Sequence, residues 1–392
     1  MFALILLAIT SLCGSLLADQ KFDDLRKAAE QGDANSQKNL GNAYCLGTGV
    51  AKDQVEAMKW WRKAAEQGHA LAQYNLGNAY FLGTGVVKDQ VEGVKWMRKA
   101  ADQGNAVAQV NLGFAYCDGK GVVKDQVEGV KWMRKAAEQG DPDAQRALGA
   151  AYLDGNGVAE DEAEAVKWWR KAANQGDAKS QFNLGIAYYE GRGVAKNLVE
   201  AVKWIRKAAE QGIADAQFNL GNAYHFGEGV AKDPAEAVKW WRKVAEQGDA
   251  VAYFNLGNAY ANGEGVAKNP AEAVRWYRKA AEQGDASAQH NLGNAYHLGE
   301  GVAKDPAEAV KWTRKAAEQG NAGAQFNLGQ VYYFGEGVAK DQVEAYAWVN
   351  LAAVTDEDAK IKRTELEKTM TAQQVATGQK RSTALSALIK KK

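Results

Sequence analysis

The chain has 392 residues, of which 25% are charged, and a formal net charge of +1. A single hydrophobic core stops growing at about 250–300 residues, so this length excludes one compact core and favours an array or several units. The balanced charge gives no indication of a nucleic-acid-binding protein.

The first 18 residues resemble a secretory signal peptide. Residues 2–18 carry no charge, and an apolar run at residues 2–9 precedes a segment with Ser and Gly, so cleavage is expected after Ala18. No Lys or Arg precedes the apolar run, and Leu16 is large for its place before the cut. An uncleaved membrane anchor is therefore the alternative. We expect a periplasmic or secreted protein, with membrane contact only through this segment if it is retained.

A 36-residue unit follows a short leading helix and recurs nine times. Residues 19–32 predict one helix that caps the array. The nine units are 33–68, 69–104, 105–140, 141–176, 177–212, 213–248, 249–284, 285–320 and 321–356. Because one unit is too small to bury a core alone, this period predicts an all-α fold, an α/α superhelical solenoid of helix-turn-helix repeats with helical caps. Below, position n denotes the residue of each repeat that corresponds to residue n of the first.

The first helix of the unit is predicted at residues 34–46. Leu40, Ala43 and Tyr44 share one face of this helix, and Asp33 stands where an N-cap belongs. The helix should end near Gly47, because glycine tolerates the positive φ of a helix C-cap.

The second helix is predicted to begin after Asp53, which forms a capping box with Glu56. Pro234, Pro270 and Pro306 occupy the first helical position of later copies, where the missing N–H costs nothing. Tryptophan at position 60 and tyrosine at position 44 return in every repeat, and we assign both columns to the core, received by small residues at positions 41, 43 and 64. The Lys and Arg residues of this helix are expected to face solvent.

The ninth repeat differs, because its second helix is apolar on more sides and needs a cover. Residues 357–392 are expected to supply a helical cap with a basic tail. The first tail helix should span residues 356–370, with Ile361, Leu366 and Met370 on one stripe, and the second should span about residues 372–389.

The repeat resembles a known family. The pattern from Ala34 through Leu40 and Gly41 to Ala64, Ala65 and Gly68 is similar to the Sel1-like repeat, a relative of the tetratricopeptide repeat. This resemblance implies an α/α superhelix that acts as an adaptor for protein complexes, in bacteria often exported. One branch of the family, the cysteine-rich Helicobacter proteins, implies the alternative of a penicillin-binding or weak β-lactamase activity. That branch has a pair of cysteines in each repeat, and this chain lacks those pairs.

The resemblance to the tetratricopeptide groove places positions 35, 38, 42, 45 and 46 on the concave surface. The second half of the array carries aromatic and amide side chains at three of these positions. The candidate residues for binding a partner protein or extended peptide are Phe182, Phe218, Asn222, His225, Phe254, Asn258, His290, Asn294, His297 and Phe326. The aromatic rings would supply contact area and the amides would bind peptide backbone. Packing of the position-38 rings on the neighbouring helix is the alternative.

The residue between the loop glycines is acidic in the same half of the chain, at Glu228, Glu264, Glu300 and Glu336. This row could select a basic partner segment or could be a solvated edge. No Ser-x-x-Lys or His-Glu-x-x-His motif occurs, so we expect no catalytic residue, no metal and no cofactor. Cys45 and Cys117 occupy the same position two repeats apart and are expected to be free thiols. Nothing implies an obligate oligomer.

Overall fold

The computed structural model describes residues 21–390, whose regular secondary structure is entirely helical. The expected signal peptide, residues 1–18, and the last two lysines lie outside the described residues. Among the described helices, none is both long and apolar enough to cross a bilayer. The chain divides between Asn197 and Leu198 into two compact units, here called unit 1 and unit 2.

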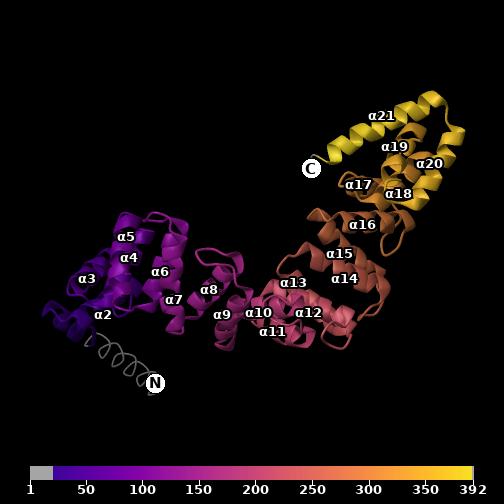
Figure 1. The fold of residues 1–392 in the computed structure, drawn as a ribbon. Coiled ribbons are helices and arrows are strands. Elements are labelled where there is room, and N and C mark those ends of the chain that lie inside the picture. Colours follow the sequence, from indigo (N-terminus) through magenta and orange to yellow (C-terminus); the bar gives the residue numbers. More distant parts are fainter. Residues whose placement is uncertain (1–20, 391–392) are drawn as a thin grey trace, which may run out of the picture. The chain divides into compact units, whose positions relative to one another are not determined.

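Unit 1 begins with helical residues 21–30, which lie within the expected N-terminal cap. Its further helices alternate between the predicted first and second helix of the repeat, here called helix A and helix B. They are α2 (Ala34–Leu46), α3 (Gln54–Glu66), α4 (Ala70–Leu82), α5 (Gln90–Asp102), α6 (Ala106–Asp118), α7 (Gln126–Glu138), α8 (Pro142–Asp154), α9 (Glu162–Asn174) and α10 (Ala178–Glu190). Within unit 1, each helix from α2 to α10 packs against the next one in the chain (Figure 1).

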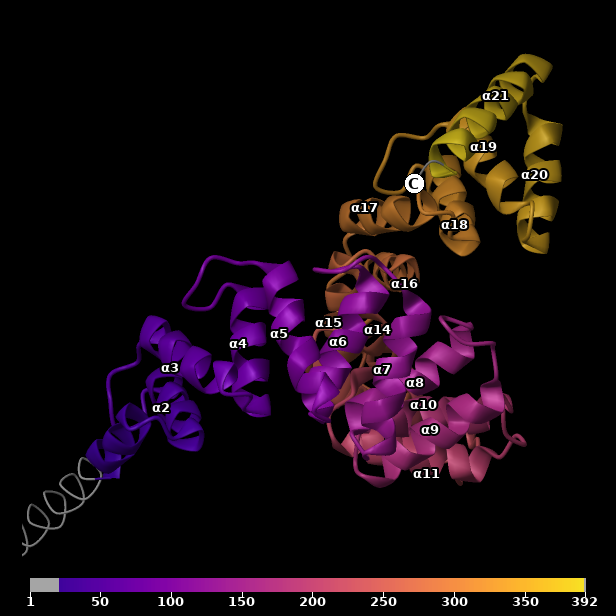
Figure 2. The same cartoon turned by 60° about the vertical axis from the view of Figure 1, so that its left-hand side comes forward.

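Unit 2 continues the alternation and ends with two further helices. Its elements are α11 (Leu198–Glu210), α12 (Ala214–Phe226), α13 (Pro234–Glu246), α14 (Ala250–Asn262), α15 (Pro270–Glu282), α16 (Ala286–Leu298), α17 (Pro306–Ala317), α18 (Ala322–Phe334), α19 (Gln342–Ala352), α20 (Glu357–Thr369) and α21 (Ala372–Ile389). Successive helices from α11 to α20 again pack side by side, which is seen for α16 to α19 in Figure 2, and α21 packs on α19. Both units are therefore α-solenoid segments.

The helix ends follow the predicted signals, with one difference. Asp33 accepts a hydrogen bond from the backbone N–H of Ser36, and Gly47 ends α2 in the left-handed region with φ of 78°. Asp53 likewise caps α3 through the N–H groups of Val55 and Glu56. The second half of the predicted capping box does not form, because the Asp53 N–H donates to the carbonyl of Tyr44 at 2.9 Å. The Glu56 carboxylate pairs instead with a lysine one turn later.

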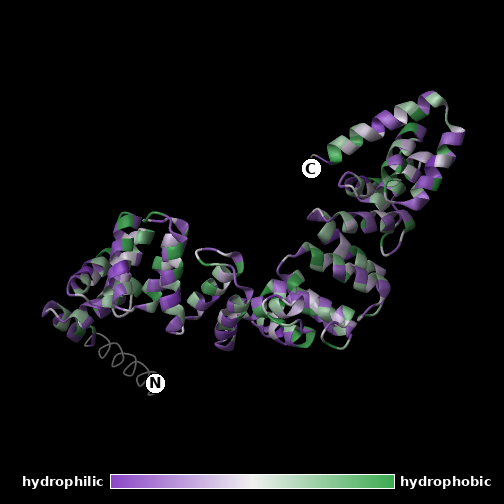
Figure 3. Ribbon diagram, viewed as in Figure 1, coloured by the Kyte–Doolittle hydropathy of each residue, from purple (hydrophilic) through white to green (hydrophobic). Residues whose placement is uncertain are grey.

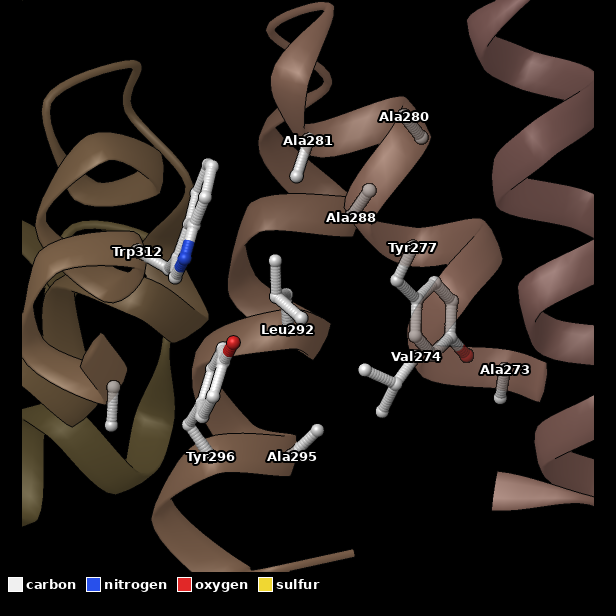
Figure 4. Close-up of a cluster of buried hydrophobic side chains, with 11 residues drawn as sticks. Ala273, Val274, Tyr277, Ala280, Ala281, Ala288, Leu292, Ala295, Tyr296 and Trp312 are labelled. Carbon is white, nitrogen blue, oxygen red and sulfur yellow. The ribbon is translucent and has the colours of Figure 1, made fainter. Parts of the chain in front are cut away.

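The core of each repeat is centred on a leucine at position 40. This column has no exposed surface in any repeat: Leu40, Leu76, Leu112, Leu148, Leu184, Leu220, Leu256, Leu292 and Leu328. The position-60 tryptophans are buried or half-buried, and a lysine three residues later covers the ring in most repeats, as Lys135 does over Trp132 with its ammonium 3.9 Å from the ring centroid. In Figure 4, Leu292 lies between Trp312 and Tyr277, all within one cluster.

The ring that packs against the glycine at position 41 belongs to position 61, not to Trp60 as predicted. A Cβ atom on Gly41 would lie 2.5 Å from the ring of Trp61, and Gly221 and Trp241 repeat this close contact. The position-61 column is buried throughout: Trp61, Met97, Met133, Trp169, Ile205, Trp241, Tyr277, Thr313 and Val349. Glycine is needed here because any side chain would displace the ring.

The arginines of helix B are not simply a solvated face. Arg134 donates to the hydroxyl of Tyr152 in the next repeat at 2.7 Å, and Arg206 does the same to Tyr224. Position 44 is consequently half-buried in most repeats rather than fully in the core. The prediction of a purely solvent-facing basic surface was wrong, because the long arginine side chain reaches across the boundary between repeats.

A buried glutamine at position 37 links successive helices in most repeats. The Gln217 amide donates to the carbonyl of Ala209 at 3.0 Å and accepts from Gln247 at 2.9 Å. In the seventh repeat, Tyr253 takes this place and stacks on Trp276 with ring centroids 5.7 Å apart. A buried amide whose donor and acceptor are both used costs little and fixes the register of the helices.

The C-terminal helices α20 and α21 pack against α19, the apolar second helix of the ninth repeat. Tyr346, Leu366 and Met370 are buried together, and the Tyr346 hydroxyl donates to Glu367 at 2.8 Å. Ile361 is exposed, so the predicted stripe holds at two of its three residues. The helix α20 is mostly hydrophilic along its length (Figure 3), and its buried residues are Ala359 and Leu366.

Candidate partner-binding face

The candidate residues lie on helices A, half-buried at positions 38, 42 and 45. The surface formed by positions 38, 42, 45 and 46 of α12, α14, α16 and α18 is called the helix A face of unit 2. Phe182 belongs to unit 1. There it lines a pocket of about 260 Å³ with Trp169 and Ile186, beside the ion pair of Arg192 with Glu162 at 3.0 Å.

Two candidate residues converge on Trp241 in the sixth repeat. Asn222 accepts a hydrogen bond from the indole N–H at 3.1 Å, and the ring of His225 lies 5.3 Å from the indole centroid. The Nδ1 atom of His225 has no hydrogen-bond partner among the described residues and lies 3.9 Å from the carboxylate of Glu264. Phe218 is half-buried on the same helix.

The seventh repeat has the same arrangement with a tyrosine. Asn258 accepts from the hydroxyl of Tyr277 at 2.7 Å, and the ring of Phe254 packs 6.1 Å from that of Tyr277. Burial raises the pKa of Tyr277 above its usual value. Asn258 and Phe254 therefore both contact Tyr277 within the repeat, although both are also partly exposed at its surface.

The eighth repeat differs because position 61 is Thr313, which makes no such bond to Asn294. Asn294 and Asn327 each place an amide nitrogen about 3 Å from Nε2 of His290, at 3.1 and 3.0 Å, and Asn327 also donates to Asn294 at 2.9 Å. An Nε2 that accepts from amide groups belongs to a neutral imidazole with its proton on Nδ1. Burial lowers the pKa of His290 and favours the same neutral form.

The last two candidates lie in the ninth repeat or face it. Phe326 packs against the C-terminal cap, beside the cluster that contains Tyr346 and Leu366. His297 places Nδ1 3.5 Å from the carboxylate of Glu336, so the acidic row is paired with a histidine of the preceding repeat here. The described residues contain no group of three or more side chains that could hold a metal ion.

A pocket of about 260 Å³ opens between α16, α17 and α18, at the side of Thr313. It brings the predicted residues Asn294 and His297 together with Gln330 and Phe334, which the sequence analysis did not single out. At position 61 this pocket has a threonine, where most other repeats have larger side chains.

Comparison with known proteins identifies the repeat. The Sel1 repeat model matches nine consecutive segments, at residues 34–69, 70–105, 106–141, 142–177, 178–213, 214–249, 250–285, 286–321 and 322–353. The chain belongs to the Sel1 repeat family. No curated protein sequence matches it.

Two solved structures of Sel1 repeat proteins resemble this chain over most of its length, and a third covers a smaller part. A protective antigen of uropathogenic Escherichia coli with an SLR fold is 36% identical, with coverage of 94% of this chain and 96% of that chain and a TM-score of 0.55. A Sel1 repeat protein from Oxalobacter formigenes is 37% identical, with coverage of 81% and 93% and a TM-score of 0.59. The cysteine-rich protein B of Helicobacter pylori is 27% identical over 33% of this chain and 92% of its own, with a TM-score of 0.28.

The cysteines of these Sel1 repeats are free thiols, as predicted for Cys45 and Cys117. Burial raises the pKa of Cys117, which lowers the fraction of its thiolate form at neutral pH. The paired cysteines of the Helicobacter branch are absent from the sequence, so the penicillin-binding alternative gains no support from them.

Proposed function

We propose that this Sel1 repeat protein is a non-enzymatic scaffold that holds a partner protein or extended peptide on the helix A face of unit 2. Proteins of this family generally mediate protein–protein interaction. Asn222 and Asn258 accept hydrogen bonds from the aromatic rings beneath the face. We therefore assign these two residues the role of positioning those rings, and not of binding the backbone of the partner.

One observation carries the proposal. In α12, α16 and α18, position 46 at the end of the helix places a large apolar side chain in solvent: Phe226 is 65% exposed, Leu298 is 61% exposed and Phe334 is 59% exposed. Leu46 and Leu82 of unit 1 are exposed at the same position, but no acidic residue stands between the loop glycines that follow them. The three residues of unit 2 lie beside half-buried histidines and the acidic row. An apolar centre with a polar rim is the usual anatomy of a protein-binding surface.

The test compares exposed apolar residues on and off the face. The double variant Phe226→Ser with Leu298→Ser should reduce capture of the partner from an envelope extract by about tenfold or more, because central apolar contacts dominate interface energies. Val199→Ser is the matched control, since Val199 is also 65% exposed but lies on helix B. All three residues are exposed, so the melting temperature should not change. Equal capture by the double variant and the control would contradict the proposal.

We also propose that the protein is exported, on the evidence of the uncharged apolar segment at residues 2–18. Mass spectrometry of the protein from its native host should find a mature chain that begins at Asp19. A chain that begins at Met1 in the membrane fraction would indicate an uncleaved anchor instead.

A further inference from the structure

The pocket beside Thr313 borders a small side chain at position 61, whereas the pocket of similar volume beside Phe182 borders Trp169 at that position. In the sixth and seventh repeats, Trp241 and Tyr277 fill the corresponding space, and each ring donates to the asparagine at position 42. Thr313 is too short to do so, and Asn294 turns to His290 and Asn327. Val349 is similarly small, but the C-terminal cap buries it. The pocket at Thr313 is bordered by residues of the helix A face.

The rim of this pocket carries a carboxylate that pairs with no lysine or arginine among the described residues. The side chain of Glu336 is 50% exposed, and its one ion-pair contact within 4 Å among the described residues is with His297. Lys340, the nearest basic residue in sequence, instead places its ammonium over the ring of Tyr333, 5.4 Å from the centroid. The rim therefore favours a cation and disfavours an anion.

The remaining lining offers a flat apolar surface and hydrogen-bonding groups. The ring of Phe334 stands edge-on to Tyr333 and is largely exposed. The amide of Gln330 makes no hydrogen bond with any other described residue and borders the same space. A carboxylate, an amide and an aromatic face match the guanidinium group, which is planar, carries several donors and stacks on aromatic rings. A lysine ammonium would pair with the carboxylate but would stack less well on the aromatic ring.

We propose that the Thr313 pocket binds an arginine side chain of the partner protein. Its volume of about 260 Å³ lies below the range of about 300–1,000 Å³ usual for drug-sized ligands, so it suits one side chain. The guanidinium pairs with Glu336, stacks on Phe334 and meets Gln330. This inference rests on the proposed function, because the partner supplies the arginine through its docking on the same face.

The experiment titrates the full chain with three small probes by ligand-observed NMR: Nα-acetyl-arginine amide, Nα-acetyl-lysine amide and Nα-acetyl-citrulline amide. Citrulline keeps the shape of arginine but lacks the charge. Arginine should bind about fivefold or more tighter than citrulline and tighter than lysine. Equal binding of arginine and citrulline would overturn the proposal.

Two variants locate the binding. Glu336→Gln should weaken arginine binding by about tenfold, whereas Glu300→Gln, at the same position one repeat earlier and outside the pocket lining, should have no effect. Equal effects of Glu336→Gln and Glu300→Gln on arginine binding would overturn the proposal.

The probe titration separates this inference from the proposed function, since it needs no partner. If arginine does not bind, the proposed arginine site is overturned, whereas the proposed binding function of the helix A face is unaffected. Unchanged partner capture by Phe226→Ser with Leu298→Ser, neither of which lines the pocket, overturns the proposed function instead.

Discussion

Asn222 accepts a hydrogen bond from the indole N–H of Trp241, which lies 19 residues later in the same repeat, at 3.1 Å. The same relationship joins Asn42 to Trp61 at 2.9 Å, and the hydroxyl of Tyr277 takes the place of the indole beside Asn258. A half-buried asparagine thus satisfies the polar atom of a buried ring. Its loss would leave that atom unpaired in the core.

Replacing Asn222 should therefore destabilise unit 2. We expect Asn222→Ala to cost about 1–3 kcal/mol, because the indole N–H of Trp241 loses its acceptor while remaining buried. The urea midpoint of unfolding measures this loss. Asn78→Ala is the matched control, since the ring at position 61 of that repeat is replaced by Met97, which has no N–H. A similar midpoint shift in both variants would show that the hydrogen bond is not the cause.

Phe254 should prove to be a packing residue as much as a surface one. Its ring packs on Tyr277 and borders the core cluster of the seventh repeat. Because the side chain is half-buried, Phe254→Ala should cost about 2 kcal/mol, less than the 3–5 kcal/mol typical of a fully buried phenylalanine. Thermal unfolding followed by circular dichroism measures the change. A melting temperature equal to that of the unaltered protein would assign Phe254 to binding alone.

Thr313→Trp should be tolerated and should raise stability. Gly293 stands opposite position 61, as Gly221 does opposite Trp241, and Asn294 is placed to accept the new indole N–H. Filling a cavity and adding this bond should contribute about 1–2 kcal/mol. The urea midpoint should therefore rise. A fall of the midpoint would indicate that the helices of the eighth repeat have closed too far to admit a ring.

The stability of unit 2 should depend on pH through His290. Burial lowers its pKa in the folded protein below the ordinary value of 6.5, so the unfolded chain takes up the proton first as the pH falls. The contribution of His290 to stability is complete above pH 6.5 and is lost as the pH falls below it towards the folded pKa. His290→Phe introduces the phenylalanine that the two preceding repeats have at this position, Phe218 and Phe254. The variant should show a smaller difference in urea midpoint between pH 7.5 and pH 5.5. An unchanged difference would assign the pH dependence to other groups.

The protein should not hydrolyse a β-lactam. The sequence lacks the Ser-x-x-Lys motif of serine β-lactamases, and it lacks the cysteine pairs of the Helicobacter branch. Turnover of nitrocefin by the purified mature protein should therefore equal that of a buffer control. Hydrolysis that survives repeated purification and scales with protein concentration would reopen the enzymatic alternative.

Much of the fold could be predicted from the sequence, because its signals are local. The helix A boundary at Gly47 follows from the left-handed conformation that glycine tolerates, and the cap at Asp33 follows from a short acceptor before the first turn. Leu40 was assigned to the core because nine copies of one amphipathic pattern repeat the same apolar position. A constant 36-residue period required each repeat to meet its neighbour in the same way.

Only the tertiary structure decided which side chains meet across the helices. Positions 60 and 61 are about 100° apart on helix B and both face inward, so periodicity could not show that Trp61, not Trp60, packs against Gly41. The same ambiguity concealed the bond that engages Asn222 and the space left beside Thr313. Local signals determine where a helix begins and which face is apolar, whereas contacts between faces depend on the depth and rotation of packing, which no single segment encodes.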